Sequence, residues 1–574
     1  MTGPRCSELG PRQRAEDLRR LREETFDVVV VGGGVTGAGA ALDAASRGVS
    51  VALVEARDWA AGTSSRSSKL IHGGLRYLEQ LNFRLVREAL KERGLMLTTL
   101  APHLVRPVPF LIPLQHWWQR PYYGAGVALY DLFATAPGVS RGVPLHRHLT
   151  RRTALRLMPA LRPEALRGAI QYFDGQVDDA RHTLAVARTA RAYGAALVSS
   201  ARVTGLRRDG ERVAGVTVRD LETGEKIDVR ARSTIAATGV WSDDIGELVG
   251  AQSSLRVRAS KGVHLVVARS RIEGQRGLIL RTATSVLFVI PWDEHWIIGT
   301  TDTDWDLDRA HPAASSRDIE YLLDNVNRVL RRPLRPEDIE GVYAGLRPLL
   351  SGESDATSAL SREHAVVAPL PGLVLIAGGK YTTYRIMARD AVDEAVRCLA
   401  GALPPSRTQA IPLVGVDGYA TAVAARSETA AAHALRLDQM EHLLLRYGAL
   451  AADVLALVAD RPELRRPVPG APGTLQAEVV YAAMAEGALH LDDVLTRRTR
   501  ISIETPDRGL RAAEAAATLV GEVLGWDAAV QANELAHYRA RVDAERESQR
   551  QPDDRTADAA RLGAPDVRGA AAIH

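Results

Sequence analysis

Two apolar runs near the N-terminus have the length of buried β-strands. The first is Phe26 to Val31 and the second is Val49 to Val54. Apolar runs without polar alternation are typical of parallel strands that are covered on both faces. Between them lie the small residues Ala38 to Ala45, which suit a helix packed closely on a sheet. The pattern therefore predicts a β-α-β unit in a parallel sheet.

The turn after the first run carries the spacing G-x-G-x-x-G, formed by Gly32, Gly34 and Gly37, and Glu55 follows the second run. Glycines let the backbone approach a pyrophosphate, and the new helix offers free N–H groups at its N-terminus. A carboxylate after the second strand accepts hydrogen bonds from a ribose diol. This order predicts dinucleotide binding, and it does not separate NAD from FAD.

The middle of the chain alternates strand-like runs with turns. Asp209-Gly210 and Thr223-Gly224 are typical of hairpin turns. Val286 to Ile290 is predicted to pair with Trp296 to Gly299, and Leu373 to Ile376 is a further short strand. A helix is expected to begin near residue 380.

The pattern changes at about residue 403, where alanine- and leucine-rich segments acquire a helical period. We expect an all-α domain over residues 403–545 and a disordered polar tail over 546–574. Residues 1–25 form a polar arm. The part between, 26–402, is predicted to be one large α/β unit.

Composition narrows the class of protein. The chain has 574 residues, 46% hydrophobic and 25% charged, with a net charge of only +4 and two cysteines. These values fit a soluble multidomain protein in a reducing cytoplasm and exclude a basic nucleic-acid-binding stripe, so no nucleic-acid partner is expected. No apolar run approaches the roughly 20 residues that span a bilayer.

The motifs, taken in order, resemble one known family. GGGVTGAGAALDAASRG, GTSSRSSKLIHGGLRYLE, VDDAR, AATGVW, SKGVHLVV, GTTDTD, GLRPLL and GGKYTTYR, followed by YAAMAEGALHLDDVLTRRTRI, resemble the aerobic FAD-dependent glycerol-3-phosphate dehydrogenases. The resemblance implies an α/β fold with a glutathione-reductase-type FAD-binding Rossmann domain. An antiparallel-sheet substrate domain, roughly residues 76–170 and 255–350, would be interleaved with it, and an all-α C-terminal domain would follow.

The resemblance also implies site residues. Non-covalent FAD would be held by residues at the glycine-rich turn, in the segment after it and at three later glycines: Gly32, Gly34, Gly37, Glu55, Thr63, Ser64, Ser65, Lys69, Gly73, Gly74, Gly239, Gly378 and Gly379. Gly73 and Gly74 would let the backbone pass beneath the flavin ring. Substrate would be bound by Arg76, Tyr77, Arg362, Lys380, Thr382 and Lys261. For Lys261 and Thr382, roles in bracing a strand and capping a helix are equal alternatives.

His264, His72 and Arg347 are the expected catalytic residues. The implied reaction is oxidation of sn-glycerol 3-phosphate to dihydroxyacetone phosphate, with hydride leaving for flavin N5 and electrons passing to a membrane quinone. His264 is the first choice for the base because histidine titrates near working pH. Arg347 is instead a candidate for orienting the hydroxyl, and the sequence does not settle the base.

Three other functions stay open at this stage: a glycerol-3-phosphate oxidase that uses O2, an amino-acid oxidase of the same fold, and a non-catalytic flavoprotein scaffold. Trp117, Trp118, Tyr122 and Tyr123 beside Arg120 suit a headgroup layer, although packing on the protein itself is the alternative. We expect a cytoplasmic protein held peripherally on the inner membrane face, with homodimerisation left open.

Two sequence patterns suggest metal binding, but neither has the full set of residues that a metal site requires. Asp302, Asp304, Asp306 and Asp308 alternate as in a calcium loop, but Leu307 stands where such a loop has glycine. His146 and His148 have no third ligand at metal spacing. We expect no metal and interpret the aspartates as a polar turn.

Overall fold

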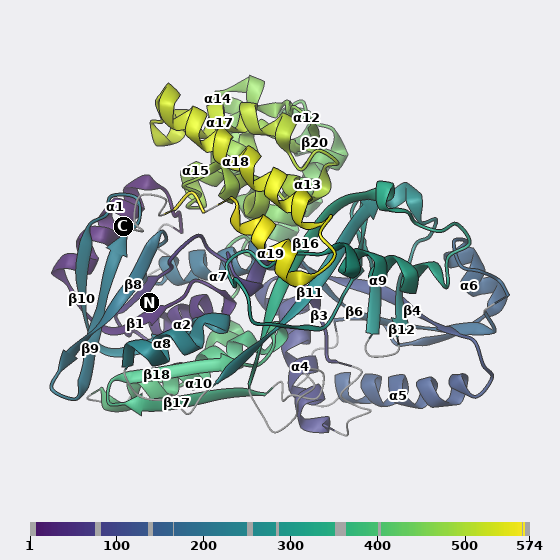
Figure 1. Ribbon diagram of the computed structural model, residues 1–574, viewed down its shortest axis with the longest axis horizontal. Helices are drawn as coiled ribbons and strands as arrows, with labels where there is room; N and C mark the ends of the chain where they lie inside the picture. The colour runs from purple at the N-terminus through teal and green to yellow at the C-terminus, as the bar shows by residue number, and fades with distance from the viewer. Residues whose placement is uncertain are drawn as a thin grey trace.

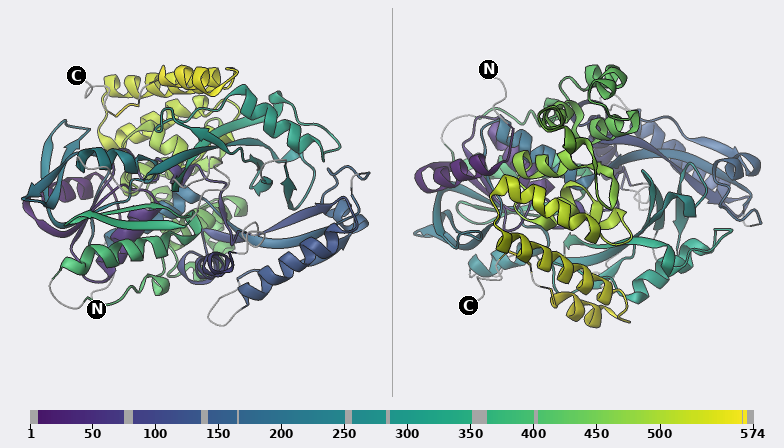
Figure 2. Two further views of the ribbon diagram at one scale, coloured as in Figure 1. Left: turned by 60° about the horizontal axis from the view of Figure 1, so that its bottom comes forward. Right: turned by 90° about the horizontal axis from the view of Figure 1, so that it is seen from above.

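The computed structural model describes residues 7–74, 82–135, 142–164, 166–249, 256–282, 286–350, 363–399, 403–564 and 566–568. Two sheets lie side by side and a helical cap lies across their junction (Figure 1; Figure 2, right). The mixed α/β architecture with a helical C-terminal region confirms the predicted fold class.

The first sheet is the dinucleotide-binding half. Its strands run in the order β17-β18-β10-β1-β2-β7, and β8 and β9 continue it from β10. Pairing is parallel between β18, β10, β1, β2 and β7. The bounds are β1 Thr25–Val31, β2 Val51–Val54, β7 Ala196–Val198, β8 Ala201–Asp209, β9 Arg212–Asp220, β10 Lys226–Ala236, β17 His364–Leu370 and β18 Leu373–Gly378. Both predicted hairpin turns are confirmed.

Helices cover this sheet and explain why its strands are apolar throughout. The helix α2 Val35–Ser46 packs against both α7 Asp179–Ala192 and α10 Tyr384–Ala395. Small residues such as Ala38, Ala41 and Ala44 are fully buried there, which allows the close approach. The helix α1 Pro11–Glu23 packs on β7, and α8 Ser242–Val249 follows β10.

The second sheet has the order β15-β11-β14-β13-β12-β4-β6-β3, with β16 on β11 and β5 on β6. Pairing is antiparallel except between β12 and β4. The bounds are β3 Leu70–Ile71, β4 Val105–Leu114, β5 Arg147–Thr150, β6 Gly168–Val177, β11 Val257–Ala268, β12 Gly277–Arg281, β13 Val286–Trp292, β14 His295–Gly299, β15 Thr303–Trp305 and β16 Ile339–Leu350. The predicted pairing of the strands that became β13 and β14 is confirmed.

Helices lie on both faces of the second sheet. α4 Phe83–Leu95 and α5 Gln119–Ala134 share one apolar cluster with β4 and β6. α6 Arg151–Leu157 and α9 Ser316–Asn327 share another with β11 and β13. In Figure 1, α5 lies along the edge of the molecule opposite the cap.

The cap is mainly helical. Its helices are α11 Tyr419–Ala424, α12 Arg426–Ala432, α13 Leu437–Tyr447, α14 Ala451–Asp460, α15 Gln476–Ala485, α16 Ile501–Glu504, α17 Leu510–Leu524, α18 Ala528–Ser548 and α19 Asp554–Leu562. A two-stranded hairpin, β19 Pro467–Val468 and β20 Ala471–Leu475, interrupts them. Leu437–Asp460 is long and apolar enough to cross a membrane, but it comprises α13 and α14, which supply Leu443 and Val454 to the cap core.

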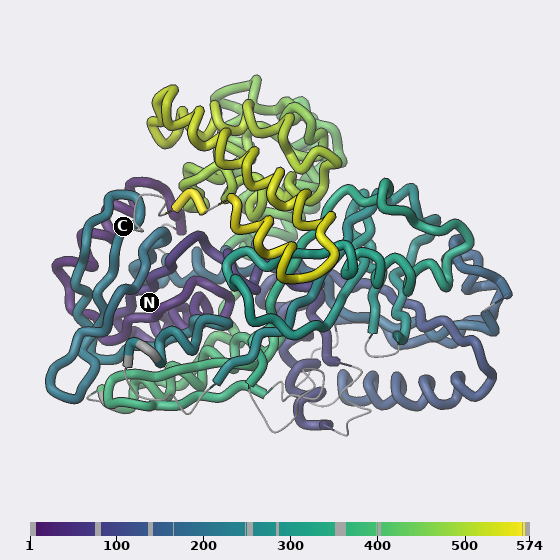
Figure 3. The backbone as a smooth tube through the Cα atoms, in the orientation of Figure 1, coloured from purple at the N-terminus to yellow at the C-terminus, as the bar shows by residue number. Residues whose placement is uncertain are grey.

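The prediction of a disordered tail is wrong for the described residues 546–564 and 566–568. The helix α19 packs beside α18, and Ala557, Asp558, Arg561 and Arg568 are buried. Figure 3 shows this C-terminal segment at the base of the cap, where Asp554 binds Lys261 of β11 and Arg568 binds Ser200 beside β8. Ion pairs, not an apolar face, anchor it, as shown below.

Candidate active site

The glycine-rich turn has the geometry of a dinucleotide site. Gly34 is the N-cap of α2, and Gly32 has φ +108°. A Cβ on Gly37 would lie 1.9 Å from the carbonyl oxygen of Gly32, so only glycine fits this contact. The Glu55 carboxylate accepts from the backbone N–H of Gly33 at 2.5 Å and of Arg57 at 2.8 Å. Burial raises the pKa of Glu55, and these backbone donors oppose the rise.

The segment Thr63–Gly74 crosses from this turn to the second sheet. The Ser64 hydroxyl accepts from the Val35 N–H at 3.0 Å, so it caps α2, and the Thr63 hydroxyl donates to the Leu346 carbonyl at 2.6 Å. The Ser65 carbonyl accepts from Lys69 Nζ at 2.7 Å. These hydroxyls thus fix the loop itself.

Lys69 is buried in an ion-pair network. Its Nζ lies 2.6 Å from Asp179, and both side chains are fully buried. Arg500, from the cap, binds the same carboxylate at 2.6 Å and also Asp178. Burial and the charge of Arg500 lower the pKa of Lys69 to about 8, against the pull of the aspartates. Lys69 therefore anchors the segment to α7, which corrects the prediction that it wraps the pyrophosphate.

His72 is held by a residue that is distant in sequence. The Thr382 hydroxyl accepts from the His72 N–H at 3.2 Å and donates to the His72 carbonyl at 3.3 Å. Thr382 lies in the 3₁₀ turn Tyr381–Thr383 before α10. Thr382 therefore positions His72, a role that differs from both helix capping and direct substrate contact.

At position 73 only glycine fits, because neighbouring side chains of the protein occupy the space of a Cβ. A Cβ there would lie 2.6 Å from Leu90 Cδ2 and 2.7 Å from the Tyr130 hydroxyl. That hydroxyl accepts from the Gly73 N–H at 2.8 Å and donates to Asp174 at 2.7 Å. The collision that we predicted with the flavin is thus, for Gly73, a collision with α4 and α5. Gly74 has φ +76°, where glycine is favoured.

His264 lies on β11 with its ring almost fully buried. Its Nε2 is 2.8 Å from the Ser68 hydroxyl, and its ring stacks on Tyr343 at 4.7 Å between centroids. A Cβ on Gly299 would lie 2.3 Å from His264 Cδ2, so β14 leaves room for the imidazole only through glycine. Burial, then Arg347 and Lys69, hold the pKa of His264 well below its usual value. The imidazole is therefore neutral and able to accept a proton.

Arg347, on β16, pairs in register with Ser260 of β11. Its Nη2 donates to the Thr300 hydroxyl at 3.1 Å, and its Nη1 lies 3.4 Å from Asp302. A Cβ on Gly262 would lie 2.7 Å from Nη2. The guanidinium is thus fixed over β11, on the face that carries His264. Asp302, which we had interpreted only as part of a polar turn, positions it.

Lys261 does not belong to this site. Its Nζ binds Asp318 of α9 at 2.6 Å and Asp554 of α19 at 2.5 Å, and the side chain is fully buried. Successive strand residues point to opposite faces, so Lys261 and His264, three positions apart, face apart. The prediction of Lys261 as a substrate ligand is wrong, and its bracing alternative holds.

The remaining predicted residues follow β10 and β18. Gly378 ends β18 and Gly379 follows it immediately before Lys380, with φ +77° and +75°. Gly239 has φ +59°, and nothing lies within 4 Å of a Cβ built on it. Arg76, Tyr77 and Arg362 lie outside the described residues. Among the described residues, no group of three potential ligands forms a metal site.

FAD fits the residues that are present. The glycine N-cap of α2 and the close-packed Gly32 and Gly37 suit its pyrophosphate, Glu55 directly follows β2 as in a dinucleotide-binding fingerprint, and open space remains beside Gly239. Sequence reasoning missed Asp179 and Arg500, which hold the segment in place, although both lie in motifs that carried the resemblance, VDDAR and TRRTRI.

Comparison with known proteins agrees with this geometry. A family model described as FAD dependent oxidoreductase matches residues 27–385, and one described as the C-terminal domain of alpha-glycerophosphate oxidase matches 406–531. Glycerol-3-phosphate dehydrogenase 2 of Mycobacterium tuberculosis is 58% identical over 98% of this chain and 95% of its own length. The human mitochondrial glycerol-3-phosphate dehydrogenase is 37% identical over 90% of this chain and 73% of its own.

Among solved structures, glycerol-3-phosphate dehydrogenase from Bacillus halodurans complexed with FAD superposes with a TM-score of 0.76 at 28% identity, covering 93% of this chain and 98% of that one. Family models and relatives together span both sheets and the cap. The chain belongs to the FAD-dependent glycerol-3-phosphate dehydrogenase family.

Proposed function

We propose that this protein oxidises sn-glycerol 3-phosphate at carbon 2 to dihydroxyacetone phosphate and passes the electrons to a membrane quinone. The observation that carries the reaction is the pairing of a buried, neutral His264 with a fixed Arg347 on one face of β11. A neutral imidazole accepts a proton, and a guanidinium beside it stabilises negative charge on the oxygen that loses that proton.

FAD, when bound, supplies a two-electron acceptor that takes hydride at N5. The chain positions the substrate and moves the proton. His264 Nε2, now hydrogen-bonded to Ser68, would accept the proton of the carbon-2 hydroxyl. Arg347 would hold the same oxygen, because Asp302 and Thr300 restrict its guanidinium. His72, fixed by Thr382, would line the cavity beside the reacting carbon.

The phosphate group requires cations at the other end of the cavity. We propose Lys380, which immediately precedes the turn of Thr382, together with Arg76 and Arg362 outside the described residues. Arginine and lysine bind phosphate through charge-assisted hydrogen bonds. The relatives named glycerol-3-phosphate dehydrogenase support this choice of substrate.

A quinone acceptor fits a membrane-facing surface on α5 and the turn before it. Trp117 is 83% exposed, Trp118 48% and Tyr122 51%. Exposed aromatic side chains of this kind suit the headgroup layer of a bilayer. α5 lies away from the cap in two views (Figures 1 and 2), so contact with a membrane there would leave the cap in solution.

Anaerobic titration of the FAD-loaded protein with glycerol 3-phosphate tests the proposal. The flavin absorbance band should bleach with one equivalent of substrate, and glycerol should be a poor reductant because it lacks the phosphate. Added quinone should then restore the band faster than O2 does. Rapid reoxidation by O2 with release of hydrogen peroxide would favour an oxidase, and bleaching by amino acids but not by glycerol 3-phosphate would refute the substrate.

A further inference from the structure

A cavity lies between the cap and the catalytic half, the part of the chain that forms the two sheets. It has a volume of about 70 Å³, several times the roughly 10–15 Å³ needed for one water. One wall carries Ser65, Arg66 and Tyr343, and the other carries Arg508 and residues of α18 and α19. Of the described residues predicted to hold FAD, Ser65 alone lines it, so the cavity borders the site predicted for FAD but does not include Glu55 or the glycines of the dinucleotide turn.

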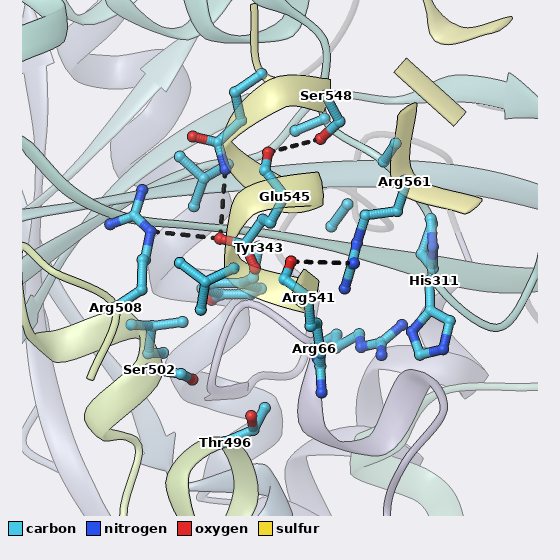
Figure 4. Close-up of a pocket in the computed structure, with 18 of the residues that line it drawn as sticks. Arg66, His311, Tyr343, Thr496, Ser502, Arg508, Arg541, Glu545, Ser548 and Arg561 are labelled. Atoms are coloured by element: carbon cyan, nitrogen blue, oxygen red, sulfur yellow. Dashed lines mark hydrogen bonds and ion pairs between the residues drawn. The ribbon is translucent and has the colours of Figure 1, made fainter. Parts of the chain in front are cut away.

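Arginines dominate this cavity (Figure 4). Arg541 of α18 and Arg561 of α19 extend from the cap toward Arg66 on the opposite wall. Arg508 lies nearby and pairs with Glu545 at 3.3 Å, and Arg541 pairs with Asp492. Arg66 and Arg561 instead donate to carbonyl oxygens, those of Ala310 at 3.0 Å and Arg541 at 3.3 Å. No carboxylate among the described residues forms an ion pair with either, so positive charge exceeds negative charge.

Several buried donors at the cavity have no hydrogen-bond partner in the described part of the chain. They include Nη1 of Arg508, which is only 5% exposed, and the Ser502 hydroxyl. A buried cation or hydroxyl without a partner is costly. Burial, together with repulsion from Arg57 and Arg541, holds the pKa of Arg66 well below its usual value. Asp492 and Glu545 thus balance only part of the positive charge at the cavity.

We propose that this cavity binds a tetrahedral oxyanion of the size of inorganic phosphate, held by Arg66, Arg508, Arg541 and Arg561. Planar guanidinium groups match tetrahedral oxyanions through paired N–H donors. The volume is sufficient for such an ion.

Binding would join the C-terminal segment to the catalytic half. Arg561 belongs to α19, and Arg66 belongs to the Thr63–Gly74 segment that carries Lys69 and His72. An anion between them offsets the repulsion that now opposes docking of α18 and α19. The protein should therefore be more stable in phosphate than in chloride at equal ionic strength. This inference does not rest on the proposed reaction.

Isothermal titration of the full-length, FAD-loaded protein with inorganic phosphate tests the site, and thermal unfolding in phosphate and in chloride gives a second readout. Wild type should show a phosphate site that Arg561→Gln and Arg66→Gln weaken about 10-fold or more, with a correspondingly smaller rise in Tm. Arg555→Gln, on the exposed face of α19, should behave as wild type.

Phosphate should also compete with glycerol 3-phosphate at the proposed active site, and that inhibition separates the two sites. Its inhibition constant should stay the same in Arg561→Gln and Arg66→Gln. If a variant does not fold, Arg66→Lys keeps the charge but loses the planar fork, and it should bind phosphate more weakly than wild type. Phosphate binding and a Tm rise in Arg561→Gln and Arg66→Gln equal to those of wild type would overturn the proposal.

Discussion

The chemistry of His264 follows from three neighbouring residues, which together with burial keep its imidazole in the neutral form. Its ring is 2% exposed, stacks on Tyr343 and lies close enough to Arg347 for repulsion to lower its pKa. Its one hydrogen bond in the described structure joins Nε2 to the Ser68 hydroxyl. A substrate hydroxyl that replaced this contact would meet a neutral ring, whose Nε2 accepts a proton in the tautomer that carries hydrogen on Nδ1.

His264→Gln should therefore slow flavin reduction by about 10²–10⁴-fold while FAD stays bound. Because the pKa of His264 is below 6.5, the acid limb of the wild-type profile should lie below pH 6.5 and should vanish in the variant. Stopped-flow reduction at a series of pH values measures both effects. His72→Gln is the control and should keep the acid limb. If the acid limb vanished in His72→Gln but survived in His264→Gln, His72 would be the base and His264 the positioning residue.

Lys261 gives a stability prediction at the same scale. Lys261→Met would leave Asp318 buried without its cation, while Asp554 remains partly exposed. We expect a loss of about 3 kcal/mol in the free energy of unfolding, at the lower end for a broken buried pair. Denaturant unfolding measures the loss, and KM for glycerol 3-phosphate should not change. A raised KM with an unchanged free energy of unfolding would show that Lys261 binds the substrate.

At the scale of elements, the sequence predicted strands and their pairing better than it predicted what each side chain contacts. The two-residue period of β11 already places Lys261 and His264 on opposite faces, so that error was avoidable from the sequence. The partner of Gly73 was not accessible, because Leu90 and Tyr130 come from two later helices. Asp302 belongs to an aspartate pattern that we rejected as a calcium loop and interpreted as a polar turn. In the structure its carboxylate positions Arg347.

The exposed face of α5 and its preceding turn leads to a prediction about membranes. The double variant Trp117→Ala/Trp118→Ala removes two exposed rings and should weaken binding to anionic lipid vesicles about 10-fold or more, since burying a large apolar side chain contributes roughly 1.5–3 kcal/mol. Vesicle sedimentation measures this, and flavin reduction by glycerol 3-phosphate should be unchanged. Tyr193→Ala, which removes an exposed ring in the other half of the molecule, is the matched control; equal vesicle binding by all three proteins would refute the surface.

At the scale of the whole molecule, buried ion pairs between segments distant in sequence join the cap to the first sheet and its helices, and join the C-terminal segment to the cap. Arg500 binds Asp178 and Asp179 of the α7 region, Arg498 binds Asp58, and Arg568 binds Asp493. The tail was predicted to be disordered because its sequence has no apolar period. Its anchors are charges whose partners lie far away along the chain, and no local pattern reveals them.

His490 makes one of these junctions depend on pH. Its Nδ1 lies 2.8 Å from Glu534 of α18, and its Nε2 lies 3.1 Å from Glu222 in the turn between β9 and β10. Burial and Arg568 lower the pKa of His490, but the two carboxylates outweigh them and raise it to about 9. Since the folded pKa exceeds the unfolded value of about 6.5, protonated His490 stabilises the fold fully below pH 6.5, and this contribution is lost as the pH rises through 9.

His490→Gln should therefore cost about 3 kcal/mol of unfolding free energy near pH 6, and the difference from wild type should shrink steadily between pH 6.5 and 9. Denaturant unfolding across this range measures it. Comparing the two proteins at each pH cancels Lys69, whose lowered pKa of about 8 acts in the opposite direction above pH 8. His537→Gln on α18 should track wild type throughout. A His490→Gln difference that stays constant with pH would show that His490 bridges the cap and the first sheet as a neutral ring.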